Sequence, residues 1–157
     1  MADLATSNPS QTPTVAQVST GYSYYESGSL TSSKYDTSSD QNILAGLIWS
    51  ENASLPAGTG VIVSLRSAGA EVNLDAATWR EVASSTSGYL TSGCLKDGAT
   101  VTCNDSVIPA TLKDLSNDRW VQYKVELQAT ITDVPTADGI QVIYVVNSPP
   151  EVQNVTA

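Results

Sequence analysis

Short segments with the alternating pattern of β-strands recur along this chain about every ten to fifteen residues, separated by polar turn clusters. The clearest are Gly60–Ser67 and Arg119–Thr132, in which apolar and polar residues alternate. Helical patterns are confined to the short stretches Leu74–Val82 and Leu112–Asn117. The pattern predicts an all-β fold, an antiparallel sandwich or barrel of about eight to ten strands.

The chain is acidic and carries little charge of either sign. Its 157 residues include seven Lys and Arg against sixteen Asp and Glu, a formal net charge of −9. Phosphate binding needs clustered basic residues, so this balance argues against nucleic acid and against an anionic membrane surface as partners. No apolar run is long enough for membrane insertion. The lack of histidine removes the commonest general base and the commonest transition-metal ligand.

The two ends of the chain differ in composition from its middle. Residues 1–20 are rich in Ser, Thr, Pro and Gln, and are interpreted as a linker or tail because they lack the basic and apolar regions of a signal peptide. Pro149-Pro150 cannot continue a central strand. We therefore expect a β-sandwich module over residues 21–147, with residues 148–157 as a linker and the start of a following fibronectin-III-like domain.

Two cysteines, Cys94 and Cys103, flank a turn signal at Asp97-Gly98. A hairpin that folds at this turn would bring the two thiols close enough to pair. The sequence therefore predicts a disulfide, which would place the chain in an oxidising compartment. The alternative is a pair of inert thiols.

Three groups of residues resemble a known type of module. They are Leu30-Thr31-Ser32-Ser33 followed by Tyr35-Asp36, Gly58-Thr59 before a strand with Leu65-Arg66, and Arg119-Trp120-Val121-Gln122-Tyr123. With them, the segment from Tyr22 to Val146 resembles the jelly-roll β-sandwich modules of large bacterial secreted and cell-surface proteins. These modules are similar to concanavalin-A-like and galactose-binding-like domains. The resemblance implies a jelly-roll fold, an extracellular or cell-surface location, and a role in carbohydrate binding, adhesion or spacing.

One face of the 119–132 strand carries the chemistry of a sugar-binding surface. An aromatic ring matches the C–H face of a pyranose, and neighbouring amides and charges bond its hydroxyls. Trp120 begins this face, and Gln122, Lys124 and Glu126 follow it at every second position. These four residues are candidate ligand-binding residues. The structural alternative is a Trp120 that a loop covers.

Further candidates come from other segments. Arg66 joins the same site if its strand lies nearby, Trp79 follows a polar segment, and Tyr25 belongs to an aromatic run at residues 22–25. Packing within the domain is the alternative for Trp79 and Tyr25. Trp49 lies among apolar residues and is expected in the core.

Two oxygen-rich loops are candidate sites for a structural Ca²⁺, which is the single cofactor that the sequence suggests. One loop contributes Asp36 and Asp40, and the other contributes Asp114 and Asp118. Neither loop matches an EF-hand, and turn-forming hydrogen bonds of Asp and Ser explain both without a metal.

The sequence carries no motif of an enzyme. It lacks Gly-x-Ser-x-Gly, a phosphate loop and a Cys/His pair, and its six Glu residues cannot be paired into a glycosidase site from sequence alone. We expect a non-catalytic extracellular module that binds carbohydrate or mediates adhesion by stacking sugars on exposed aromatics. Its partners would be a glycan or cell-surface polymer and the neighbouring domains of the same chain. The alternative is a structural spacer, or a filament or surface-layer domain, with all three Trp buried and no small ligand.

Overall fold

The computed structural model describes residues 27–85 and 93–145. These residues form nine strands, one short helix and two 3-10 turns. The strands are β1 (Ser27–Thr31), β2 (Tyr35–Asp36), β3 (Ile43–Glu51), β4 (Gly60–Ala68), β5 (Arg80–Ser84), β6 (Cys94–Asp97), β7 (Thr100–Cys103), β8 (Trp120–Gln128) and β9 (Ala137–Val145). The helical elements are α1 (Glu71–Leu74), η1 (Asp105–Val107) and η2 (Ala110–Leu112). The candidate Tyr25 and both predicted tails lie outside the described residues.

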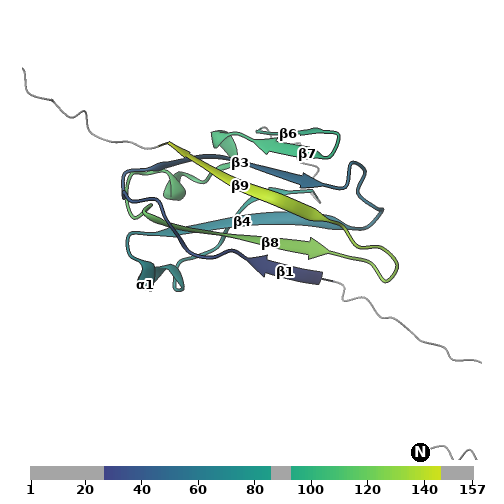
Figure 1. The fold of residues 1–157 in the computed structure, drawn as a ribbon, viewed down its shortest axis with the longest axis horizontal. Helices are drawn as coiled ribbons and strands as arrows, with labels where there is room; N and C mark the ends of the chain where they lie inside the picture. Colours follow the sequence, from purple (N-terminus) through teal and green to yellow (C-terminus); the bar gives the residue numbers. More distant parts are fainter. Residues whose placement is uncertain (1–26, 86–92, 146–157) are drawn as a thin grey trace, which may run out of the picture.

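The strands form two antiparallel sheets that stack as in a β-sandwich (Figure 1). The first sheet has the order β1-β8-β4-β5, with β2 also paired to β8, and the second has the order β6-β7-β3-β9. This arrangement confirms the predicted all-β, antiparallel fold. The helical stretch expected at Leu74–Val82 is shorter and earlier, because the chain turns after α1 and enters β5.

The core lies between the sheets, as the alternation in the sequence predicts. Val61, Val63 and Leu65 point inwards from β4 and are fully buried. Leu47 and Trp49 meet them from β3, the inner strand of the second sheet. Each side chain of this size stabilises the fold by about 1.5–3 kcal/mol when it leaves water completely.

The edge of the first sheet is interrupted. Both β1 and β2 pair with β8, with Thr31 opposite Lys124 and Tyr35 opposite Val121. The residues between them, 32–34, do not continue the ladder. Ser32 bridges the interruption, because its backbone N–H donates to Tyr123 O at 2.9 Å and its Oγ accepts from the Tyr123 N–H at 3.1 Å. The edge therefore opens where the chain passes from β1 to β2.

The β6–β7 hairpin confirms the predicted disulfide. Cys94 and Cys103 face each other across the two strands and are bonded. The strands join at Gly98, whose φ of 57° lies in the left-handed region that favours glycine. The disulfide fixes this hairpin at the edge of the second sheet.

Candidate functional site

The three tryptophans lie in different environments. Trp49 is buried as expected, and its Nε1 donates to Glu51 Oε2 at 3.0 Å. Trp79 and Trp120 are half-buried. Trp120 occupies the first position of β8, opposite Asp36 on one side and Ala68 on the other. Two of the three rings therefore reach solvent, unlike the arrangement expected for a purely structural module.

The structure brings four of the predicted ligand-binding residues together on the outer face of the first sheet. We call Trp79, Arg66, Gln122 and Lys124 the Trp79 cluster. The Arg66 guanidinium lies 4.4 Å from the centre of the Trp79 ring, and Lys124 Nζ lies 5.5 Å from it. Lys124 also pairs with Glu126 at 3.0 Å. Two cations thus lie against the aromatic ring, the arrangement of a cation–π contact.

Hydrogen bonds hold the Trp79 cluster in place. Arg66 is only 8% exposed, and its Nε and Nη2 donate to Gln122 Oε1 at 2.9 and 2.6 Å. Its other donors reach Asp75, the backbone oxygen at 3.0 Å and Oδ1 at 3.2 Å. Lys34 donates to the second carboxylate oxygen of Asp75 at 2.7 Å, and this bond, with the charges of Lys34 and Arg66, lowers the pKa of Asp75. The cluster is a satisfied network and not an open aromatic platform.

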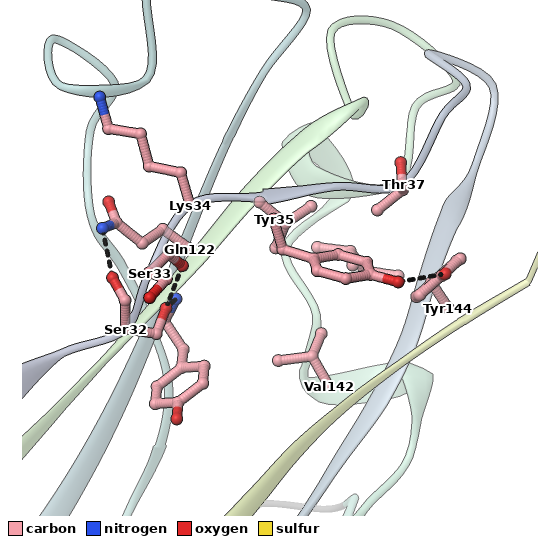
Figure 2. Close-up of a pocket in the computed structure, with 11 residues that line it drawn as sticks. Ser32, Ser33, Lys34, Tyr35, Thr37, Gln122, Val142 and Tyr144 are labelled. Atoms are coloured by element: carbon pink, nitrogen blue, oxygen red, sulfur yellow. Dashed lines mark hydrogen bonds between the residues drawn. The ribbon is translucent and has the colours of Figure 1, made fainter. Parts of the chain in front are cut away.

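A separate cleft opens between the edges of the two sheets. It has a volume of about 440 Å³ and lies where the interrupted β1–β2 edge faces β9 (Figure 2). Tyr35 from β2 and Tyr144 from β9 meet at one side of it. We call it the tyrosine cleft. It is lined by Ser32, Ser33, Lys34, Tyr35, Thr37, Leu44, Val121, Gln122, Tyr123, Val142 and Tyr144.

The two tyrosines form one aromatic wall across the sheet edges. Their hydroxyls lie 3.3 Å apart, and their ring centres are 6.1 Å apart with the planes tilted by 52°. The hydrogen bond to Tyr35 raises the pKa of Tyr144. Tyr35 is 57% exposed, so its ring is open to solvent. Figure 2 shows the rings pointing toward one another, with Val142 beside Tyr35.

Gln122 connects the tyrosine cleft to the Trp79 cluster. Its Oε1 accepts from Arg66, while its Nε2 donates to the backbone oxygen of Ser32 at 2.6 Å. Ser32 belongs to the cleft lining, so the cluster supports the cleft from the outer face of the sheet. The predicted residue Gln122 thus lies at the site, whereas Trp120, two residues earlier on the same strand face, is not among the residues that line the cleft.

The sequence-based candidates missed the two tyrosines. Tyr35 and Tyr144 lie 109 residues apart, and both occupy inward-facing positions of edge strands. An available signal was the alternation of Ile140, Val142 and Tyr144, which places Tyr144 on the apolar face of its strand. The meeting of the two tyrosines depends on how the two sheets stack, which the alternation of a single strand does not specify.

The two predicted calcium loops meet at one end of the molecule. The backbone N–H of Thr37 donates to Arg119 O at 2.8 Å, and its Oγ1 donates to the same oxygen at 2.7 Å. Asp36 forms a two-point ion pair with Arg119, with distances of 2.9 and 3.0 Å, and this contact lowers the pKa of Asp36. In residues 27–85 and 93–145, no three Asp, Glu, Cys or His side chains converge as a preformed metal centre.

The remaining two carboxylates differ in their surroundings. Asp114 is exposed, and its Oδ1 accepts from the Ser116 N–H at 3.0 Å. Asp118 is buried, and its Oδ1 accepts from Ser67 Oγ at 2.7 Å. Burial, with the nearby charge of Asp114, raises the pKa of Asp118 to about 6.

No helix within the described ranges has the length and apolar character that crossing a membrane requires. Comparisons of the chain with protein-family models, with curated proteins and with solved structures gave no match.

Proposed function

We propose that this chain is a non-catalytic extracellular module of the jelly-roll type that binds carbohydrate in the tyrosine cleft. The observation that carries the proposal is the pair formed by Tyr35 and Tyr144, which bounds a solvent-accessible cleft of about 440 Å³ with hydroxyl and amide groups around it. Sites for small ligands combine apolar walls with a few polar groups in volumes of roughly 300–1,000 Å³.

The cleft offers both kinds of contact that a sugar needs. Exposed Tyr35 presents an aromatic ring for the C–H face of a pyranose. The hydroxyls of Ser33, Tyr35 and Tyr144 belong to residues of the lining and can bond sugar hydroxyls. The net charge of −9 favours a neutral glycan over a sulfated or uronic acid-rich one.

The disulfide supports the extracellular part of the proposal. Cys94 and Cys103 are joined, and disulfides persist in oxidising compartments. The proposed partners are a glycan or cell-surface polymer together with neighbouring domains of the same protein.

A glycan array combined with pull-down on insoluble polysaccharides tests the proposal. The wild-type chain is expected to bind at least one neutral glycan. Y35A is expected to lose at least tenfold in affinity, because it removes the stacking surface, whereas Y35F keeps the ring and is expected to retain most of the binding. W79A is the matched control, since it removes an aromatic side chain from the outer face of the same sheet.

Two results would count against the cleft. Binding that W79A abolishes and Y35A leaves unchanged would move the site to the Trp79 cluster. Silence of the folded wild-type chain on every glycan would favour the second candidate, a structural spacer. That candidate is supported by the Trp79 ring, which already has Arg66 and Lys124 against it.

A further inference from the structure

Two buried polar atoms have no hydrogen-bond partner within the described part of the chain. They are Asn42 Oδ1 and Asp118 Oδ2, and each residue is only 1% exposed. A buried polar group without a partner costs free energy, and a buried carboxylate costs more. Both atoms belong to the same end of the molecule, in the loop before β3 and in the loop before β8.

The two loops are tied to one another through Thr37. Asn42 Nδ2 donates to Thr37 O at 2.8 Å, and Thr37 Oγ1 lies 3.3 Å from the backbone oxygen of Asp118. These bonds use the nitrogen of the Asn42 amide and leave its oxygen free. They also fix the segment from which the Asp118 side chain projects.

More side-chain oxygens converge at Gly69, which follows β4. A methyl group at Gly69 would lie 2.9 Å from Asn117 Oδ1 and 3.3 Å from Asp40 Oδ1. One of these oxygens comes from each loop, so the two loops face the same small space. Glycine at this position keeps that space open.

No basic side chain of the described residues is paired with Asp118. The neighbouring basic side chain, Arg119, is held by Asp36 through both carboxylate oxygens. Asp114 adds negative charge near Asp118, and the donors that face Asp118, the Ser67 hydroxyl and the backbone N–H groups of Asp114 and Ser116, are all neutral. A cation from solution would supply the missing countercharge.

We propose that the loops 36–42 and 114–118 bind one divalent cation of the calcium type, with Asp118 as the buried carboxylate and Asp40, Asn42 and Asn117 as further oxygen ligands. Ca²⁺ accepts carboxylate, amide and backbone oxygens together with water in irregular arrangements, whereas Mg²⁺ demands a near-ideal octahedron. This ligand set differs from the one expected from the sequence. Asp36 is taken by Arg119 and Asp114 caps Ser116, and the amide oxygens of Asn42 and Asn117 stand in place of these two carboxylates. The site is independent of the proposed glycan binding.

Calorimetric titration of the chelator-treated protein with Ca²⁺ tests the proposal, with Mg²⁺ as the comparison. One Ca²⁺ is expected to bind per chain, with at least tenfold weaker binding of Mg²⁺, and to raise the midpoint of thermal unfolding. Tb³⁺ provides a second readout, because Trp120 lies two residues from Asp118 and can sensitise its luminescence.

Three variants locate the site. D118N is expected to weaken Ca²⁺ binding at least tenfold, and D40N, which alters an exposed side chain and leaves the core untouched, several-fold. D97N removes an equally exposed carboxylate from β6 and is expected to bind as the wild type does. The proposal is overturned by a wild-type chain that binds no Ca²⁺, by D40N and D118N variants that bind normally, or by equal weakening in D97N.

Discussion

Two carboxylates are buried within residues 27–85 and 93–145, and their surroundings differ. Glu51 ends β3 with a fully buried side chain, whose Oε1 accepts from Lys96 Nζ at 2.7 Å and whose Oε2 accepts from Trp49 Nε1 at 3.0 Å. Asp118 accepts from Ser67 through one oxygen, and the described part of the chain offers no partner for the other. Burial of a carboxylate is tolerated when an opposite charge and hydrogen bonds compensate for the lost water.

Burial alone therefore does not define the role of an acidic residue; the groups that compensate its charge do. Glu51 is compensated by a lysine of the same chain and anchors the β6–β7 hairpin to the inner strand β3. Asp118 is left with a raised pKa of about 6 because its compensation is incomplete. In our proposal, the cation that completes it comes from solution.

The largest expected effect comes from removal of the disulfide, which closes the hairpin that carries Lys96, the partner of Glu51. A C94A/C103A variant opens a loop closed over a sequence separation of 9 residues and frees the hairpin that carries Lys96. We expect a loss of about 2–3 kcal/mol in the free energy of unfolding, from the entropy of the unfolded chain. Urea unfolding without reductant measures it, and a loss below about 1 kcal/mol would contradict this account.

The next effect tests the ion pair itself. Glu51→Gln keeps the shape of the side chain but leaves the Lys96 charge without its partner. We expect a loss of about 2 kcal/mol, less than for a fully buried pair because the Lys96 side chain is 23% exposed. A double-mutant cycle with Lys96→Met isolates the interaction, and additive effects of the two changes would show that it contributes nothing.

The same isosteric change at Asp118 is expected to have the opposite sign. In chelator at pH 7, Asp118→Asn removes an uncompensated buried charge and should stabilise the fold by about 1 kcal/mol. The folded-state pKa lies above the ordinary 3.8, so the wild type loses stability as the pH rises from 3.8 through about 6. The gain should therefore vanish at pH 3.5. If D118N is instead less stable than the wild type at pH 7 in chelator, the charge of Asp118 is compensated, as that of Glu51 is.

The smallest effect concerns the exposed pair of Asp36 and Arg119. Arg119 lowers the pKa of Asp36, so its contribution to stability is present above pH 3.8 and is lost as the pH falls through the lowered value. Exposed pairs contribute little, so D36N should leave the unfolding midpoint in urea nearly unchanged. Carboxyl NMR titration sharpens the contrast, since Asp36 should titrate below 3.8 and Asp118 well above it. The expectation is wrong if Asp36 titrates at the same pH as Asp118 or at a higher one.

Local pattern was enough to predict part of this structure. The alternation placed Val61, Val63 and Leu65 inwards, and the turn at Asp97-Gly98 predicted the disulfide, because both depend on neighbours along the chain. The same alternation directs Arg66 away from these three residues, and on that opposite face it is buried beneath Trp79. The segment that covers it, residues 70–79, has no strand pattern that would reveal where it packs.

The tyrosine cleft and the unpartnered oxygens depend on contacts between distant segments. Tyr35 and Tyr144 meet because edge strands of two different sheets lie side by side. Asn42 was not predicted as a metal ligand, because an asparagine is common in Ser- and Asp-rich turns that bind no metal. Its significance comes from its burial and from the use of its nitrogen by Thr37, which only the folded chain reveals.

The break between β1 and β2 also affects how these molecules behave at high concentration. An unbroken edge strand presents a continuous row of backbone donors and acceptors, to which another chain can add in fibrils and aggregates. Here residues 32–34 leave the ladder. The backbone N–H and the side-chain Oγ of Ser32 bond to Tyr123, and its carbonyl oxygen accepts from Gln122, all within the same chain. The interruption that opens the tyrosine cleft thus shortens the template for intermolecular strand pairing along this edge.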